Sequence, residues 1–266
     1  MEPKKNNFKI VSDKKARIIL PNAITLIGVC IGLTSIKFSI DGKFAIAIVA
    51  ILFAGLMDAL DGRIARLIKG TSKMGKELDS LGDVISFGVA PALIMYFWNL
   101  QYLDKLGWFV CLIYVICVAL RLARFNVNSE EEPSWKDNFF EGMPSPAGGI
   151  IVLFPLIFSF SGLGKFIQVN YDLLVPLFFI VVSILLISTI PTYSFKKIVI
   201  PRSMTKFLLF GIVLFFGALL VYTFKVLAVS SLTYLCLIPI SYFHYKKIKK
   251  EKNITSDKDE GLEDIL

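Results

Sequence analysis

Long apolar segments alternate with short polar connections along almost the whole chain. An α-helix of about 20 apolar residues crosses a hydrocarbon core of about 30 Å, and the apolar segments here approach or exceed that length. The pattern predicts eight of them, at residues 22–40, 44–68, 79–98, 107–124, 146–162, 172–190, 206–223 and 226–244. We therefore expect an all-α protein, a polytopic integral membrane helix bundle with about eight transmembrane helices.

Composition supports this class and excludes several others. Of the 266 residues, 55% are hydrophobic and 19% are charged, and the mean hydropathy is +0.68. Ordinary globular chains have roughly 45–50% and about 25% respectively. A chain this apolar is not intrinsically disordered, and its four cysteines lie inside apolar segments without disulfide-scaffold or zinc-ligand spacing.

Basic residues assign an orientation to the predicted spans. With eight spans and both termini in the cytoplasm, only five of the 29 Lys and Arg residues fall on the outer side. These five are Lys37, Lys43, Lys105, Lys165 and Lys225. Cytoplasmic connections are enriched in Lys and Arg, so this split favours both termini inside.

The polar ends complete the predicted organisation. Residues 1–20 form a basic cytoplasmic or interfacial segment, residues 21–245 one transmembrane domain, and residues 246–266 a charged cytoplasmic tail, expected to be disordered from residue 253. The net charge of +8 comes from Lys clusters that flank membrane spans. Attraction to anionic headgroups of membrane lipids explains these clusters, and no nucleic-acid partner is expected.

Four carboxylates stand out because they lie at the membrane boundary around the connection between the second and third spans. They are Asp58, Asp61, Asp79 and Asp83. A carboxylate at the centre of a membrane helix costs about 2.5–3.5 kcal/mol, less near the interface, so something must neutralise the group. At 100° per residue, each pair shares one helix face with small residues, which lets the two faces approach each other.

Three interpretations of these acids follow from the residues alone. Converging carboxylates suit a hard cation such as Mg²⁺, Mn²⁺ or Ca²⁺, and a two-metal site would serve phosphoryl transfer. Alternatively, the acids pair with nearby cations in a solvated loop. Those cations are Arg63, Arg66, Lys69, Lys73 and Lys76. Intramembrane acids also mark ion or proton transporters, although there they lie near mid-bilayer on broken helices.

The spacing of these residues resembles the signature of the CDP-alcohol phosphotransferase family. Its eight fixed positions are occupied by Asp58, Asp61, Gly62, Ala65, Arg66, Gly75, Asp79 and Asp83. Further segments are similar to the phosphatidylserine synthase branch of that family. They are Pro21–Thr25, Arg121–Asn126, Gly142–Ala147 and 190–197.

The resemblance implies a reaction and a set of roles. Family members of this branch transfer the phosphatidyl group of CDP-diacylglycerol to L-serine, giving phosphatidylserine and CMP. Asp58, Asp61, Asp79 and Asp83 would bind one or two Mg²⁺ or Mn²⁺ ions, and Asp83 would also act as the general base. CDP would contact Asp58, Gly62, Ala65, Arg66 and Gly75. Candidates for serine or phosphate binding are Arg121, Arg124, Asn126, Lys196 and Lys197.

The resemblance also implies a homodimer in the cytoplasmic membrane whose active site faces the cytoplasm. The acceptor is the least specific part of this interpretation. Other members of the family use glycerol 3-phosphate, an inositol phosphate or choline in place of serine, and the flanking motifs are less strict than the eight-position signature.

Overall fold

The computed structural model describes residues 13–68, 70, 72–128, 139–163, 170–193 and 204–263. The chain divides into two compact units, residues 1–122 and residues 123–266. We describe each unit by itself.

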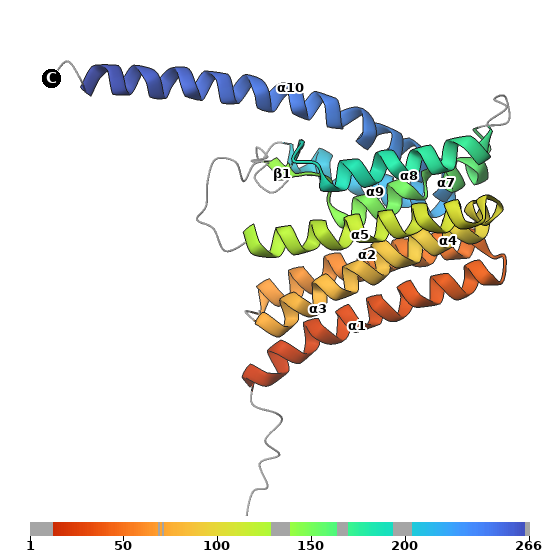
Figure 1. Ribbon diagram of the computed structural model, residues 1–266. Helices are drawn as coiled ribbons and strands as arrows, with labels where there is room; N and C mark the ends of the chain where they lie inside the picture. The colour runs from red at the N-terminus through yellow and green to blue at the C-terminus, as the bar shows by residue number, and fades with distance from the viewer. Residues whose placement is uncertain are drawn as a thin grey trace, which may run out of the picture. The chain divides into compact units, whose positions relative to one another are not determined.

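The first unit is built from long apolar helices. The elements are α1 (Asp13–Ile40), α2 (Phe44–Leu67), α3 (Lys73–Asp83), the π-helical segment η1 (Val84–Val89), α4 (Ala90–Trp98), the 3₁₀ turn η2 (Leu100–Leu103) and α5 (Lys105–Asn128), which continues into the second unit. Figure 1 shows α1, α2 and α3 running side by side, and α1 packs against α2, α3, η1 and α4.

Small residues permit this close packing. A Cβ atom added at Gly32 of α1 would lie 2.7 Å from the Ser86 hydroxyl oxygen and 3.1 Å from the Ser86 Cα. Helices in membranes approach through such residues because lipid supplies no hydrophobic driving force for association. Large side chains, including Ile51, Phe87 and Tyr114, fill the buried core of the unit.

A short turn connects α1 to α2. Gly42 has a φ of +73°, a backbone conformation that glycine adopts without strain. Just before it, the Lys37 ammonium donates to Asp41, and this hydrogen bond holds the pKa of the Asp41 carboxyl below its usual value. The two helices are therefore antiparallel neighbours with a polar turn at one end.

The second unit combines shorter helices with one two-stranded ladder. Its elements are β1 (Phe139–Glu141), α6 (Ser145–Val152), α7 (Phe154–Ser161), α8 (Tyr171–Ile187), β2 (Pro191–Tyr193), α9 (Thr205–Val221) and α10 (Thr223–Glu263). Strands β1 and β2 pair antiparallel, with Phe139 opposite Tyr193. Gly142 follows β1 with a φ of +74°, and its N–H donates to the carbonyl of Ile190 at 3.0 Å.

Every apolar segment predicted from the sequence is helical over its length or nearly so. One of them, at 146–162, is divided into α6 and α7 at Leu153, because Pro155 has no backbone N–H to continue the ladder of hydrogen bonds. Five helical segments are long and apolar enough to cross a membrane, and α8 and α9 are shorter apolar helices. The prediction of disorder from residue 253 is wrong for the part of the tail that the structure describes, because α10 continues to Glu263.

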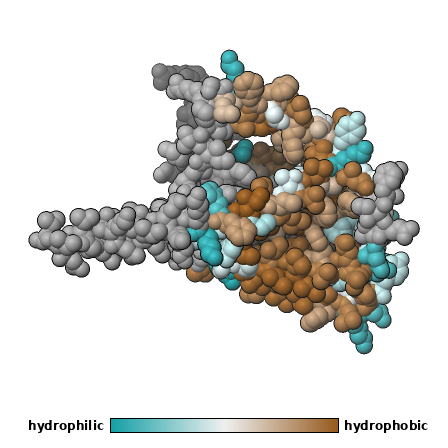
Figure 2. All heavy atoms as spheres, turned by 90° about the horizontal axis from the view of Figure 1, so that it is seen from above, coloured by the Kyte–Doolittle hydropathy of each residue, from teal (hydrophilic) through white to brown (hydrophobic). Residues whose placement is uncertain are grey.

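The surface fits a membrane environment. Figure 2 shows hydrophobic side chains over most of the visible described surface. In α9, no residue is buried, and Phe207, Phe210 and Leu220 are largely exposed. Soluble monomers rarely expose contiguous apolar patches of this extent. The protein is an all-α polytopic membrane protein.

Candidate active site

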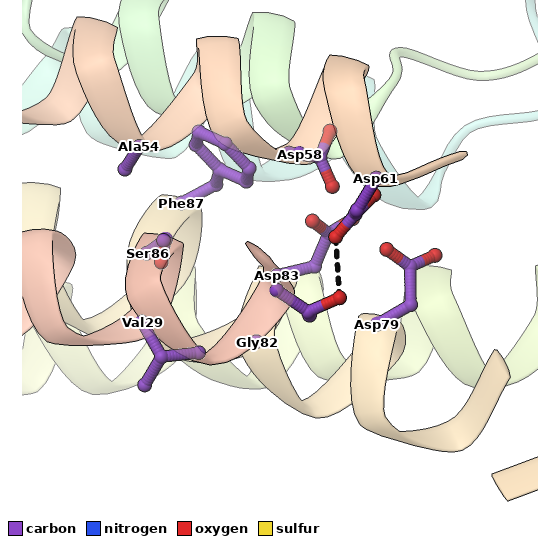
Figure 3. A pocket seen from close by; sticks show the side chains of 11 residues that line it. Val29, Ala54, Asp58, Asp61, Asp79, Gly82, Asp83, Ser86 and Phe87 are labelled. Atoms are coloured by element: carbon purple, nitrogen blue, oxygen red, sulfur yellow. Dashed lines mark hydrogen bonds between the residues drawn. The ribbon is translucent and has the colours of Figure 1, made fainter. Parts of the chain in front are cut away.

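The four carboxylates predicted from the sequence come together in the first unit. Asp58 and Asp61 lie in the last turns of α2, and Asp79 and Asp83 lie on α3. Their side chains point toward one another, as Figure 3 shows. They line a narrow recess whose walls come from α1, α2, α3 and η1. The other lining residues are Thr25, Gly28, Val29, Ala54, Gly82, Ser86 and Phe87.

The acids are close enough to share a ligand. One carboxylate oxygen from each of Asp58, Asp61 and Asp79 lies within 4.8 Å of the other two. Asp61 is only 3% exposed, and Asp58 is half-buried. Three negative groups at this spacing repel one another strongly away from bulk water unless a cation or protons neutralise them.

The described basic residues do not supply that neutralisation. Asp58, Asp61 and Asp79 form no ion pair with any Lys or Arg that the structure describes. Arg66, the signature cation nearest in sequence, donates its Nε–H to the carbonyl of Gly62 at 3.0 Å. The ion pairs expected of a solvated loop are therefore not found for these three carboxylates among the described residues, and Lys69 lies outside that part of the chain. An all-oxygen set of carboxylates is the ligand type that Mg²⁺ and Mn²⁺ prefer, so the donor set fits a divalent cation.

Local sequence fixes the start of α3. Ser72 is the N-cap, and its hydroxyl oxygen accepts the Gly75 N–H at 3.0 Å, which satisfies one of the first backbone donors. A Cβ at Gly75 would lie 2.9 Å from Oδ1 of Asn22 on α1. Glycine at this signature position therefore lets α3 pack directly against α1, one helical turn before Asp79.

The π-helical segment η1 begins directly after Asp83. Such segments insert an extra residue into a helical turn and occur frequently at functional sites. Here η1 carries Ser86 and Phe87 into the wall of the recess. The change from α-helix to π-helix thus lies between Asp83 and the apolar remainder of the predicted span at 79–98.

The predicted CDP-binding residues lie at the same end of α2. Gly62 follows Asp61, and a Cβ added there would meet no atom within 4 Å. Packing within the described residues therefore does not require glycine at this position. The absence of a side chain at Gly62 leaves open space beside the carboxylates. Ala65 is half-buried and Arg66 is exposed one turn further along.

The predicted serine-binding residues are divided between the units. Arg121 belongs to the first unit, and Arg124 and Asn126 belong to the second. The Arg124 guanidinium donates to the carbonyl of Ile187 at 2.7 Å, which satisfies a carbonyl at the end of α8. Lys196 and Lys197 lie outside the described residues.

One site residue was not assigned a role from the sequence. Thr25, in the first of the flanking motifs, places its hydroxyl oxygen 2.5 Å from Oδ2 of Asp61. The two residues are 36 positions apart, so helical spacing alone gives no signal of the contact.

Comparisons with known proteins identify relatives of this chain. Residues 18–181 match the family model described as CDP-alcohol phosphatidyltransferase. A CDP-diacylglycerol–serine O-phosphatidyltransferase from Mycobacterium leprae is 35% identical over 243 residues, covering 90% of this chain and 80% of the relative. A protein of the same name from Helicobacter pylori is 36% identical, covering 68% of this chain and 74% of the relative.

An archaeal relative has a similar name. The archaetidylserine synthase of Methanothermobacter thermautotrophicus is 36% identical over 190 residues, which cover 68% of this chain and 73% of the relative. The family match spans more than half of the chain and includes all four carboxylates of the site. The chain belongs to the CDP-alcohol phosphatidyltransferase family.

Proposed function

We propose that the protein transfers the phosphatidyl group of CDP-diacylglycerol to the hydroxyl of L-serine, forming phosphatidylserine and CMP. The observation that carries the proposal is the convergence of the signature carboxylates, with oxygens of Asp58, Asp61 and Asp79 within 4.8 Å of one another. The names of the relatives from Mycobacterium leprae and Helicobacter pylori favour serine as the acceptor over glycerol 3-phosphate, an inositol phosphate or choline.

The reaction is a single displacement at phosphorus. The serine hydroxyl oxygen bonds to the β-phosphorus of CDP-diacylglycerol, and the bond from that phosphorus to the bridging oxygen breaks. CMP leaves with the bridging oxygen and its electron pair. The hydroxyl proton goes to the Asp83 carboxylate, because an alcohol is a poor nucleophile at neutral pH and a positioned base assists it.

The other residues hold the substrates in place. Asp58, Asp61 and Asp79, with Asp83 close to them, would bind one or two Mg²⁺ or Mn²⁺ ions, which when bound offset the charge of the diphosphate and of departing CMP. The open space beside Gly62 would let the nucleotide approach the carboxylates. Ala65 and Gly75 would contact the nucleotide as the resemblance to the family implies. Arg66 pairs with a phosphate through the guanidinium N–H groups that Gly62 does not use.

The serine carboxylate requires a cation. Arg121, Arg124, Lys196 and Lys197 are the candidates, and Asn126 adds a neutral hydrogen-bonding group. Arg124 already donates one N–H to Ile187, so it has other N–H groups available for an acceptor substrate.

The setting of the reaction is part of the proposal. We infer eight transmembrane spans in a single domain at 21–245, with a basic segment at 1–20 and a charged tail at 246–266, both in the cytoplasm. The site then opens to the cytoplasmic side of the cell membrane, where CMP is released and the lipid tails stay in the bilayer. The protein acts as a homodimer.

Ion transport is the less favoured alternative. Transport sites use acids near mid-bilayer on interrupted helices. In this chain Asp58 and Asp61 lie in the last turns of α2, and Asp79 and Asp83 in the first turns of the next span. All four therefore lie toward one end of the spans that carry them.

The test is release of CMP by the purified protein in detergent. CDP-diacylglycerol is supplied with Mn²⁺ or Mg²⁺, and L-serine is compared with glycerol 3-phosphate, inositol phosphate and choline. We expect release that depends on serine and stops when a chelator is added. Release with another acceptor would keep the reaction and overturn the choice of serine. Folded protein that releases no CMP with any acceptor would overturn the proposed reaction.

A further inference from the structure

One hydrogen bond joins α1 to the carboxylate site. The Thr25 hydroxyl oxygen lies 2.5 Å from Oδ2 of Asp61 and 3.1 Å from the carbonyl oxygen of Pro21. A threonine within a helix often donates to the carbonyl four residues earlier, which here is that of Pro21. Because the hydroxyl has a single proton and the carboxylate is both closer and charged, the proton is donated to Asp61.

The same side chain also contacts the helix that carries the other two acids. Gly82 lies between Asp79 and Asp83, and a Cβ added to it would come 3.4 Å from the Thr25 methyl carbon. The Thr25 methyl group therefore packs against α3 while its hydroxyl reaches α2. This packing restricts rotation of the side chain and keeps the hydroxyl directed at Asp61.

Asp61 depends on such a partner because it is buried. Only 3% of the residue is exposed, so bulk water has little access to replace the Thr25 hydroxyl. The hydrogen bond is made to Oδ2, and the carboxylate, with two oxygens and about four lone-pair sites, keeps acceptor capacity for a cation. Hydrogen bonds to a ligating carboxylate fix its orientation, and losing one typically lowers metal affinity or activity about 10–100-fold.

We propose that Thr25 is a positioning residue whose hydroxyl holds Asp61 in the orientation in which Asp58, Asp61 and Asp79 bind one divalent cation together. The inference rests on the metal site of the proposed function. It concerns cation binding by the protein alone, so it can be tested without turnover.

The test is a titration of the metal-free protein with Mn²⁺ in detergent, without substrate, followed by the electron paramagnetic resonance signal of free Mn²⁺. Thr25→Val keeps the shape of the side chain and removes the hydroxyl, whereas Thr25→Ser keeps the hydroxyl. We expect the dissociation constant for Mn²⁺ to rise about 10–100-fold in Thr25→Val. Thr25→Ser should bind Mn²⁺ nearly as well as the unmodified protein.

Thr34→Val is the matched control. Thr34 lies on the same helix, and its hydroxyl donates to the carbonyl of Cys30 at 2.6 Å, away from the carboxylates. This variant loses an equivalent hydroxyl from α1 and should bind Mn²⁺ normally. Each variant is first shown to elute as a single species in size-exclusion chromatography. If Thr25→Val fails this check, Thr25→Ala replaces it, because alanine places less bulk against Gly82.

Three results would overturn the inference. They are normal Mn²⁺ binding by Thr25→Val, equally weak binding by Thr25→Ser and Thr25→Val, and failure of the unmodified protein to bind Mn²⁺. Failure of the proposed function gives a different result. In that case the unmodified protein binds Mn²⁺ with the expected dependence on Thr25 but releases no CMP.

Discussion

Asp83 is one helical turn beyond Asp79 on α3, and it faces the recess that the other three carboxylates line. In the proposed reaction Asp83 is the general base that removes a proton from serine, which an amide cannot do. We therefore expect Asp83→Asn to lower the rate of CMP release about 10²–10⁴-fold. The measurement is serine-dependent CMP release at saturating Mn²⁺.

Glu77→Gln provides the matched control for this prediction. Glu77 is an exposed acid on the same helix and does not line the recess. Its substitution removes one negative charge from α3 and should leave the rate close to normal. An Asp83→Asn enzyme with nearly full activity would contradict the role assigned to Asp83.

Substitution of Asp58 should change the melting temperature in opposite directions without metal and with Mn²⁺. Without metal, Asp58, Asp61 and Asp79 crowd three carboxylates within 4.8 Å, so Asp58→Asn relieves repulsion and should raise the melting temperature by a few degrees. With Mn²⁺, the native protein gains stability from binding, and the variant loses that gain. Thermal unfolding in chelator and in excess Mn²⁺ measures both effects. Equal Mn²⁺-dependent stabilisation of the two proteins would argue against Asp58 as a ligand.

At the scale of helices, the contact between α1 and η1 depends on Gly32. An added Cβ would lie 2.7 Å from the Ser86 hydroxyl oxygen, so Gly32→Ala forces the two segments apart. Overpacking of this kind typically costs about 1–3 kcal/mol. Because Ser86 lines the recess three residues after Asp83, we expect lower activity as well as a lower melting temperature.

Gly211→Ala separates the effect of packing from that of helix propensity. Gly211 lies within α9, and a Cβ there would meet no atom within 4 Å. Gly211→Ala should leave the free energy of unfolding unchanged or raise it by up to about 1 kcal/mol, because alanine favours a helix more than glycine does. If both variants melt at the same temperature, the close approach of α1 and η1 is not needed for stability.

Hydropathy predicted the helices well because a span in lipid must satisfy its backbone N–H and C=O groups with hydrogen bonds of its own, and an α-helix does so. It did not predict where a span changes its helical geometry. The π-helical turn at Val84–Val89 and the break at Leu153 depend on packing and on single residues such as Pro155. Likewise, the short, polar and acidic composition beyond residue 253 suggested disorder, whereas α10 continues as one helix to Glu263.

For the site, the sequence predicted which acids converge because their spacing places them on facing helix surfaces. It did not predict contacts made by a third helix. The hydrogen bond from Thr25 to Asp61 depends on how α1 packs against α2 and α3, and the residues involved are 36 positions apart. Gly75 is a similar case, since its smallness serves the contact with Asn22 as well as any nucleotide.

At the scale of the whole molecule, the distribution of Lys and Arg predicts which ends of the helices face the cytoplasm. Lys43 in the α1–α2 turn and Lys73 at the start of α3 are both exposed and lie at opposite ends of α2. The proposed topology places Lys43 outside the cell and Lys73 inside, beside the carboxylate site. Single cysteines at these two positions therefore test the orientation of the site directly.

The native cysteines are first replaced by alanine. They are Cys30, Cys111, Cys117 and Cys236, all of them free. In intact cells, a maleimide that cannot cross the membrane should label Lys43→Cys but not Lys73→Cys, and permeabilised cells should allow both to be labelled. The reverse pattern would place the carboxylates on the outer side of the membrane. CMP would then be released away from the cytoplasm, which is incompatible with the proposed setting of the reaction.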